Sequence, residues 1–572
     1  MDSEVALAGG DRLSRLSDGV LGHILSFLPA AEAARAALLS RRWRHVFAAV
    51  HTLSFEEPDR SVVQGSGDDN RSCWSPEYYV PVGRGLMLAP PSFVTGVTAA
   101  LLARNRRAHV PLRALRVAVD DFRAASEQLV DGWLSYAVHQ AAGELHVDLR
   151  LRREPICRRV YTLRRRGAPD DRNGDGQGFI HRRTLMNDDE PDYHDGEEDP
   201  TAMSPGCAPS DYDSMEEEEE DSASSSPFRR PGEDEYVVPR SLFSCCSTLR
   251  SLRLGSCWLD PPSAIALPSL DTLHLTWITG PSSGVQRLVA ACPRLADLTL
   301  EAFVTVTKLS LLHTRLRRLT LRCCHDLAAV AVDSSELREF EYRGDVPHPT
   351  FLTMNGPCRI SSCTLDFCGE EASDPVELAW LRDFLQLFTA TKSLHLKSAR
   401  LGGGIGTDIS TSVTAFPVFA ALRNLELTGM LPEDDTTAVA AVTRILERTP
   451  NLETMSLFFL PGPEDPNIDD YGCHEDEELH AAHQLKYNRY TPVTVSEDTM
   501  IPCLRERTRE INFVHYQGGM AQRVLAKFLL RNAPVVDEVC CGFPLGPLWM
   551  QNKLMEEIRG WVMNKSAKML FL

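Results

Sequence analysis

The residues best suited to metal or redox chemistry in this 572-residue chain are its 16 cysteines. No CxxC pair occurs among them, and no histidine or cysteine partners complete the three doublets or the one evenly spaced set. We therefore expect no metal site and no cofactor, and we expect buried structural thiols in a reducing compartment. The doublets are Cys245-Cys246, Cys323-Cys324 and Cys540-Cys541, and the evenly spaced set is Cys358, Cys363 and Cys368.

One segment, Asp171–Arg182, begins like a calcium-binding loop, with oxygen-bearing side chains at positions 1, 3 and 5 and glycine at position 6. The match then fails. Position 8 holds Gly178 in place of a β-branched residue, and position 12 holds Arg182 in place of the bidentate glutamate. We therefore expect no calcium binding by this segment.

Motifs for covalent catalysis are missing from the sequence, which has no glycine-rich phosphate loop, no GxSxG and no HExxH. The 17 histidines are scattered, and single ones such as His274 and His395 are expected on a surface rather than as catalytic bases. We therefore predict a protein without catalytic residues. The net charge of −19 argues against a general binder of nucleic acid or of anionic membranes.

The elements that position these residues follow a repeated pattern, which is clearest in three segments aligned on a proline. In each segment, two apolar residues lie five and four positions before the proline, as expected for the inner face of a short helix that proline ends. Apolar residues then fall at +2, +5 and +7, and the last two have the period of a strand. The segments are VQRLVAACPRLADLTL, AVTRILERTPNLETMSL and VLAKFLLRNAPVVDEVCC.

The LxxLxL core of this pattern recurs without the full helix signal. Its starts at 249, 270, 295, 316 and 337 have the period of a leucine-rich repeat, with one strand and one return segment per unit, which we call a rung. Stacked rungs imply an α/β solenoid, a curved parallel sheet with helices or irregular segments on its other side. Cys257 and Cys324 occupy the repeat's N/C position, which predicts a structural role for both thiols. The cores are Leu249/Leu252/Leu254, Leu270/Leu273/Leu275, Leu295/Leu298/Leu300, Leu316/Leu319/Leu321, Leu337/Phe340/Tyr342 and Leu422/Leu425/Leu427.

Two earlier rungs are expected at Leu112/Leu115/Val117 and at Leu145/Val147/Leu149, the latter preceded by a helix. Between Leu149 and Leu249 the pattern stops. The segment Gly167–Glu235 is rich in glycine, proline, serine and acidic residues, so its apolar content is too low to offset the entropy of ordering, and we expect a disordered insertion. A second acidic segment, Gly462–Glu478, is expected to be a solvated loop.

The amino-terminal stretch LSDGVLGHILSFLP, Leu16–Pro29, is apolar at helical spacing. It follows acidic rather than basic residues, and no apolar run in the chain reaches the ~20 residues that cross a bilayer, so we expect neither a signal peptide nor a membrane anchor. A core helix and a docking surface remain. Ser17 or Asp18 can cap this helix, Pro29 ends it, and two further helices follow before Val50. Three such helices cannot bury all of their apolar surface unaided.

The segment DRLSRLSDGVLGHILSFLPAAEAARAALLSRRWRHVF, Asp11–Phe47, resembles the F-box of plant F-box/leucine-rich-repeat proteins, and HTLSF after it resembles the first strand of that family. CLRERTREINFVHYQGGMAQRVLAKFLLRNAPVVDEV resembles the FBD region that closes many such proteins. This chain has Ser17 where the family usually has proline. The expected organisation is a tail (1–10), an F-box (11–50), first rungs (51–166), an acidic disordered insertion (167–235), leucine-rich repeats (236–460), an acidic loop (461–500) and an FBD-like region (501–572).

The resemblance implies the substrate receptor of an SCF-type cullin–RING ubiquitin ligase in the cytoplasm or nucleus. The F-box would dock a Skp adaptor, and through it a cullin, while the repeats would hold an unknown protein target; neither nucleic acid nor membrane is an expected partner. The residues implied in adaptor binding are Leu16, Val20, Leu21, Ile24, Leu25, Leu28 and Leu39.

Two other interpretations stay open at this stage. The protein could be a repeat scaffold that binds a peptide or small ligand without directing ubiquitylation, with the F-box helices as an end cap. DNA binding through Arg41, Arg42 and Arg44 is a weaker interpretation, because the basic charge is local and Trp43 lies where a core would need it. Co-purification with a Skp adaptor separates the first two.

Overall fold

The computed structural model describes most of the chain outside the acidic segments. The described residues are 13–36, 39–57, 93–105, 110–119, 122, 126–152, 157, 159, 161–163, 235–461 and 484–487 and 500–572, with gaps at 245, 304, 313, 373, 403–415, 434 and 436. The expected insertion Gly167–Glu235 lies outside them except for its last residue, and the segments Asp171–Arg182 and Gly462–Glu478 lie outside them entirely.

The amino-terminal helices lie where the sequence predicts them. A 3-10 turn, η1 (Leu13–Arg15), precedes α1 (Asp18–Leu25), which ends four residues before Pro29. Helix α2 (Ala30–Ala36) begins directly after that proline, which favours the first turn of a helix or the position before it. Helix α3 (Trp43–Val46) continues into the 3-10 turn η2 (Phe47–Ala49), and the chain then enters strand β1 (Thr52–Glu56).

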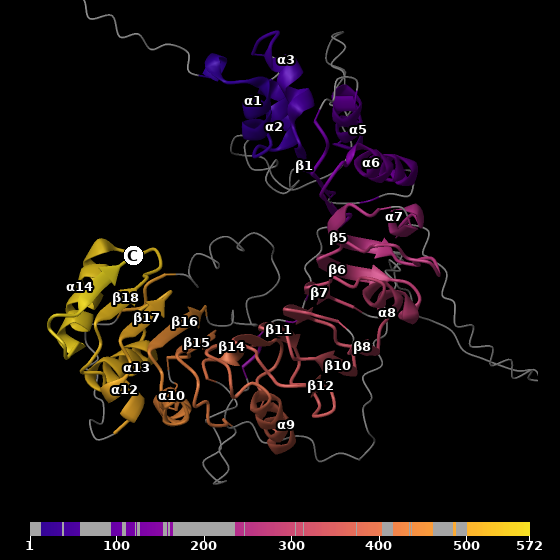
Figure 1. Ribbon diagram of the computed structural model, residues 1–572. Coiled ribbons are helices and arrows are strands. Elements are labelled where there is room, and N and C mark those ends of the chain that lie inside the picture. The colour runs from indigo at the N-terminus through magenta and orange to yellow at the C-terminus, as the bar shows by residue number, and fades with distance from the viewer. Residues whose placement is uncertain are drawn as a thin grey trace, which may run out of the picture. The chain divides into compact units, whose positions relative to one another are not determined.

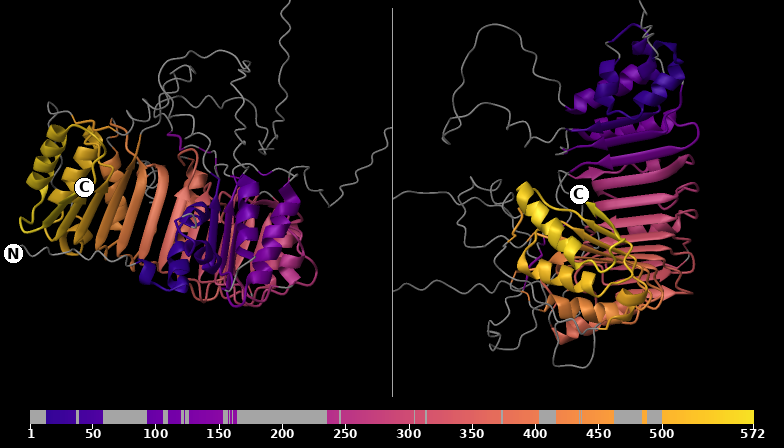
Figure 2. Two further views of the ribbon diagram at one scale, coloured as in Figure 1. Left: turned by 90° about the horizontal axis from the view of Figure 1, so that it is seen from above. Right: turned by 90° about the vertical axis from the view of Figure 1, so that its left-hand side faces the viewer.

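The rest of the described chain is built on one 16-stranded sheet in which every strand pairs in parallel with its neighbours (Figures 1 and 2). Fifteen strands stack in chain order, and β4 (Tyr236–Val237) pairs beside the end of β5. The strands after β1 are β2 (Ala114–Ala118), β3 (Leu145–Arg150), β5 (Leu249–Trp258), β6 (Thr272–Thr279), β7 (Asp297–Glu301), β9 (Arg318–Arg322), β11 (Glu339–Gly344), β13 (Ser362–Phe367), β14 (Ser393–Arg400), β15 (Asn424–Met430), β16 (Thr454–Leu460), β17 (Glu510–Val514), β18 (Glu538–Cys541) and β19 (Lys568–Phe571).

The leucines of the repeat form the core, as predicted. In β6 and β7, Leu273 pairs with Leu298 and Leu275 with Leu300, and all four are buried. The same register continues from strand to strand, so the leucines form continuous rows under the sheet while the alternate residues line the opposite face, which we call the open face. This arrangement confirms the predicted leucine-rich-repeat solenoid.

Helices cover the leucine side of the sheet in the return segments (Figure 1). Phe384 of α9 and Phe388, which follows that helix, both pack on Phe340 of β11. Their ring centroids lie 6.5 and 5.1 Å from that of Phe340. Three rungs use strands instead, and these form a second, three-stranded parallel sheet. The helices are α5 (Phe93–Asn105), α6 (Glu127–Gln140), α7 (Ser241–Ser244), α8 (Ser282–Ala290), α9 (Pro375–Gln386), α10 (Ala438–Glu447), α12 (Pro502–Glu506), α13 (Met520–Arg531) and α14 (Leu548–Trp561); the extra strands are β8 (Lys308–Leu311), β10 (Ala329–Asp333) and β12 (Leu352–Asn355).

All three proline-aligned segments form the predicted helix and strand: α8 with β7, α10 with β16, and α13 with β18. The two early rungs are β2 and β3, and the helix predicted before the second is α6. Since β3 pairs directly with β5, the chain between them is an insertion between two neighbouring rungs.

Candidate docking surface

Helix α1 has two apolar faces that meet different surroundings. Leu21 and Leu25, one turn apart, are 1% and 3% exposed and belong to the hydrophobic core. Gly22 between them lies against η2 so closely that a Cβ there would be 2.7 Å from the carbonyl oxygen of Ala49. Val20 and Ile24, also one turn apart, lie on the other face, and Ile24 is 41% exposed. The helix therefore uses one face as core and leaves the other uncovered.

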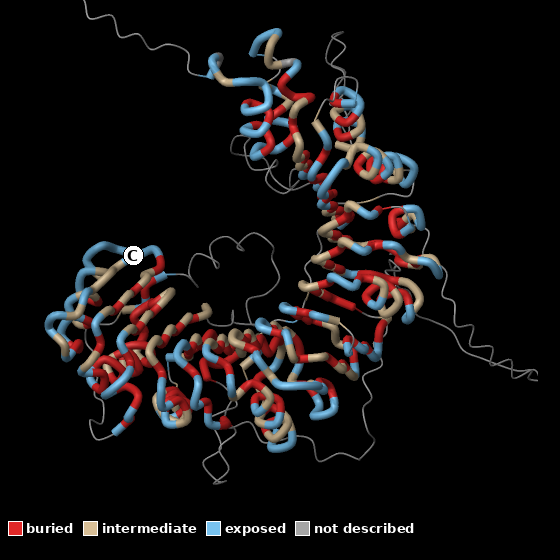
Figure 3. Tube along the Cα trace, viewed as in Figure 1, coloured by how far each residue is buried: buried red, intermediate tan, exposed pale blue. Residues whose placement is uncertain are grey.

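The uncovered face is part of a larger set of exposed apolar residues at the amino end of the described chain, where Figure 3 shows many exposed positions. Phe27, in the turn after α1, is 76% exposed, and its ring packs edge-to-face on that of His23 at 5.0 Å. Isolated exposed leucines are ordinary, but several exposed large apolar side chains within 27 residues make this region a candidate interaction surface. The exposed set is Leu13, Val20, Ile24, Phe27, Leu28 and Leu39.

The structure separates the residues that the resemblance implied in adaptor binding. Val20, Ile24, Leu28 and Leu39 are exposed and accessible to a partner, and Leu16 is half-buried against the core. Leu21 and Leu25 need a correction, because they are buried and hold α1 onto the neighbouring helices. Phe27 belongs to the accessible set although it was not among the implied residues. Phe27 follows Ile24 by three positions and Val20 by seven, and this helical spacing is the sequence signal that could have identified it.

The start of α1 is fixed without the proline that the family usually has. Ser17 is the N-cap, as predicted, and its hydroxyl accepts a hydrogen bond of 3.4 Å from the backbone N–H of Val20. Arg42 pairs with Asp18 at 2.9 Å and also donates to the carbonyl oxygen of Leu16. Residues at both ends of the three-helix unit therefore hold the first turn of α1 in place.

A pair of histidines connects the docking surface to the first strand. His23 Nδ1 and His51 Nε2 are 2.9 Å apart and share a hydrogen bond. Burial lowers the pKa of His51, and the positive charges of Arg113 and Arg104 and the neighbouring His23 lower it further. A neutral His51 ring is therefore favoured at neutral pH.

Arg104 of α5 joins the amino-terminal helices to the first rungs. Its side chain is fully buried, and it donates hydrogen bonds to the carbonyl oxygens of Val50 (2.8 Å) and Val110 (2.6 Å) and to the hydroxyl of Tyr136 (2.9 Å). A buried guanidinium is tolerated because hydrogen bonds replace the water that it loses. Val50 lies at the end of the three-helix unit, so Arg104 ties that unit to α5 and α6.

The open face of the repeats carries charged and polar side chains in register. In one cluster on this face, the carboxylate of Glu301 is 1% exposed and contacts His274 (2.9 Å), Thr276 (2.8 Å) and Arg322 (2.7 Å). Burial alone would raise the pKa of Glu301, but these three hydrogen bonds outweigh it and lower the pKa to about 2. His274, expected as a solitary surface residue, is instead part of this cluster.

His395 has a similar place on β14. Its Nε2 lies 3.0 Å from the hydroxyl of Thr428 and 3.2 Å from the carboxylate of Glu426. Both contacts run along the open face, so this histidine positions neighbouring polar side chains. Around β6, β7, β9 and β14 the open face is polar, with mixed charge, whereas Phe458 of β16 and Val514 of β17 add apolar side chains to it.

Comparison with known proteins agrees with the amino-terminal and repeat assignments. The model of the F-box domain matches residues 13–53, and the model of the leucine-rich repeats of an FBD-associated F-box protein matches residues 226–354. The chain is 26% identical over 307 residues to an FBD-associated F-box protein of Arabidopsis thaliana, which covers 53% of this chain and 63% of the relative.

Two other Arabidopsis relatives differ in how much of the chain they match. A putative F-box/FBD/LRR-repeat protein is 25% identical over 39% of this chain and 47% of its own length. An F-box/LRR-repeat protein is 51% identical over 49 residues, which are 9% of each chain. The chain thus matches less than two thirds of the length of each of these relatives.

Within the described part of the chain, no helix combines the length and the apolar character that crossing a membrane requires. The exposed apolar set lies on short helices and turns, in the segment that the F-box model matches. The chain carries a segment that matches the F-box model, followed by repeats that match the leucine-rich repeats of FBD-associated F-box proteins, which confirms its resemblance to plant F-box/leucine-rich-repeat proteins.

Proposed function

We propose that this protein is the substrate-recognition subunit of an SCF-type cullin–RING ubiquitin ligase, acting in the cytoplasm or nucleus. The F-box docks a Skp adaptor, and the repeats hold a protein target. The chain supplies no catalytic group in this role. It raises the effective concentration of target lysines near a conjugating enzyme held elsewhere in the assembly.

The observation that carries the proposal is the uncovered face of α1. Val20 and Ile24 are exposed although the opposite face of the same helix is packed into the core, and Phe27 and Leu28 extend the apolar surface beyond the helix. Docking interfaces concentrate their free energy in a few apolar anchors that become desolvated. This surface has such anchors in the segment that matches the F-box model.

The open face of the sheet supports the second half of the proposal. Many of its side chains are polar or charged, project from a regular sheet and are held by contacts such as those of Glu301 and His274. Rigid presentation of this kind favours recognition of a folded or extended protein segment by charge and shape.

The proposal is tested by co-expressing the full chain with a plant Skp adaptor and purifying the chain. We expect the wild type to retain the adaptor and the double variant Ile24→Asp/Phe27→Asp to lose it, because both substitutions place a charge in an apolar interface without touching the core. The matched control is Val376→Asp, which places the same charge on an exposed apolar position of α9, 54% exposed.

Retention of the adaptor by the double variant would overturn the proposal that this surface docks the adaptor. Absence of the adaptor from the wild-type preparation would favour the alternative function, a repeat scaffold that binds a peptide or small ligand without directing ubiquitylation. Circular dichroism of each variant separates loss of docking from loss of the fold. Substitution of Leu21 or Leu25 is unsuitable for this test because both belong to the core.

A further inference from the structure

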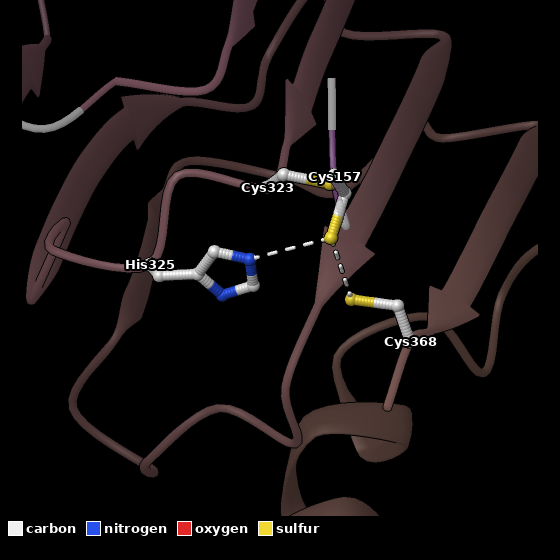
Figure 4. A group of neighbouring side chains, drawn as sticks. All are labelled: Cys157, Cys323, His325 and Cys368. Carbon is white, nitrogen blue, oxygen red and sulfur yellow. Dashed lines mark hydrogen bonds between the residues drawn. The ribbon is translucent and has the colours of Figure 1, made fainter. Parts of the chain in front are cut away.

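Four side chains from three distant parts of the chain converge at the carboxyl ends of β9 and β13 (Figure 4). Cys323 directly follows β9, His325 lies two residues later, and Cys368 directly follows β13. The fourth, Cys157, comes from the segment after β3. One ligand atom from each residue, three sulfurs and one imidazole nitrogen, lies within 4.8 Å of all the others.

We propose that Cys157, Cys323, His325 and Cys368 bind a structural Zn²⁺ ion in tetrahedral Cys₃His coordination. Three thiolates and one imidazole are a common ligand set of closed structural zinc sites, and sulfur-rich tetrahedral sites select zinc over harder cations such as magnesium and calcium.

The distances fit such a site. In a tetrahedral centre with zinc–sulfur bonds of about 2.3 Å, neighbouring sulfurs lie about 3.8 Å apart. Cys157 Sγ is 3.9 Å from Cys368 Sγ and 3.8 Å from His325 Nε2. The remaining pairs reach at most 4.8 Å, so each ligand atom needs to move by less than about 1 Å toward the centre.

The orientation of His325 also fits. Its Nε2 points toward the sulfurs, while Nδ1 faces the carboxylate of Asp345 at 3.5 Å. A proton on Nδ1 leaves the lone pair of Nε2 free for a metal, and a carboxylate behind the distal nitrogen is the usual partner of zinc-binding histidines. Arg159, from the same segment as Cys157, pairs with Asp345 from the other side.

The backbone places Cys323 at a position that the repeat itself creates. Its φ is +54°, and Ser256, Trp277 and Ala302 have left-handed values of +51° to +55° at the equivalent position of the three preceding rungs. The neighbouring Cys324 has the predicted structural role, since its Sγ donates to the carbonyl oxygens of Leu300 (3.4 Å) and Arg322 (3.5 Å). Because of the left-handed turn, the Cys323 thiol lies in the cysteine–histidine cluster, whereas the Cys324 thiol contacts backbone carbonyl groups of the repeat.

The consequence of zinc binding is a fixed position for the described residues between Cys157 and Leu163. Beyond Cys157, Tyr161 donates a 2.6 Å hydrogen bond to Asp366, and Thr162 pairs with Glu370 beyond β13. The metal would lock this segment, which leaves the sheet at β3, onto rungs that lie several strands further along.

The test uses the full chain, purified with a phosphine reductant and without chelators or a histidine tag. Inductively coupled plasma mass spectrometry is expected to find about one zinc per chain. Replacement by Co²⁺ is expected to give the visible bands of a tetrahedral thiolate site. Cys157→Ser and His325→Ala should each reduce zinc content at least tenfold, whereas Cys540→Ser, a half-buried cysteine on β18, should leave it unchanged.

Cys157 lies outside the sheet, so its substitution leaves the core of the repeats intact and the variant can be compared in the folded state. Hydrogen exchange of residues 157–163 should accelerate in this variant and after zinc removal. Folded wild-type protein with less than a tenth of a zinc per chain would overturn the proposal, as would a Cys157–Cys368 disulfide in protein alkylated without reductant. Neither result depends on adaptor docking, so this proposal and the proposed function fail separately.

Discussion

Replacement of Glu301 by glutamine is expected to destabilise the repeats around β7 in a pH-dependent manner. The carboxylate is buried and held by His274, Thr276 and Arg322, so the variant keeps its size but loses the charge that pairs with the guanidinium. Breaking this pair leaves Arg322 with the carboxylate of Glu341 at 2.7 Å, so the desolvation of the guanidinium is only partly offset.

The magnitude follows from the pKa of Glu301, which burial opposes but its hydrogen bonds lower from 4.5 to about 2. Such a difference corresponds to roughly 3 kcal/mol in favour of the folded state with Glu301 ionised. Arg322 is 36% exposed, so solvent screening reduces the expected loss in Glu301→Gln to roughly 1–2 kcal/mol at pH 7.

The lowered pKa of Glu301 also determines how its contribution to stability changes with pH. The stabilisation from ionised Glu301 is fully present above its unfolded pKa near 4.5 and is lost as the pH falls through the folded pKa of about 2. The difference between wild type and variant should therefore shrink at pH 3 to about half its value at pH 7.

Urea unfolding followed by tryptophan fluorescence at pH 7 and pH 3 measures this difference, and hydrogen exchange at pH 7 locates it at β7. Glu339→Gln is the matched control, because Glu339 pairs with Arg318 at 2.7 Å but both side chains are about half exposed. Its effect should stay below about 0.5 kcal/mol. Equal destabilisation by the two variants, or a Glu301→Gln effect that is the same at both pH values, would refute the reasoning.

Three further substitutions probe the core and the junction. Arg104→Met should destabilise the contact between the amino-terminal helices and the first rungs by roughly 2–4 kcal/mol, because the carbonyl of Val50 and the hydroxyl of Tyr136 lose their donor. Faster hydrogen exchange at Val50 measures this effect, and unchanged exchange would contradict it. Leu298→Ala should cost ~2–5 kcal/mol and loosen the neighbouring rungs, and an unchanged melting curve would show that the residue is not core. Leu25→Ala should lower the stability of the F-box helices by a similar ~2–5 kcal/mol in the absence of any partner, which circular dichroism of the free chain measures.

The fold was largely predictable because the leucines of the repeat recur at a nearly constant spacing in the sequence. Three described rungs whose first position is not leucine escaped detection. Thr508 occupies that position before β17, where its hydroxyl donates to a backbone carbonyl 3.1 Å away and so tolerates burial. Thr391 before β14 and Ile360 before β13 have equivalent places. The second sheet of β8, β10 and β12 also escaped, since its short strands lie in return segments without a leucine pattern.

The docking surface was predictable only in part. Helical spacing identified an apolar helix, but it could not say which side the core would occupy, and so Leu21 and Leu25 were grouped with Val20 and Ile24. Packing of Gly22 against Ala49 decides the orientation, and that contact joins residues 27 positions apart. The cysteine–histidine cluster was beyond spacing analysis for the same reason, because Cys157 meets Cys368 only through the stacking of the rungs.

The most direct test of the central claim is a calorimetric titration of a purified plant Skp adaptor into the full chain. A docking F-box predicts saturable one-to-one binding at micromolar concentration or tighter, weakened at least tenfold by Ile24→Ala, since a central apolar anchor contributes more than about 1.4 kcal/mol. Val376→Ala on α9 should bind as the wild type does. No binding by the folded wild-type chain, or equal binding by Ile24→Ala, would contradict the claim that the uncovered face of α1 docks the adaptor.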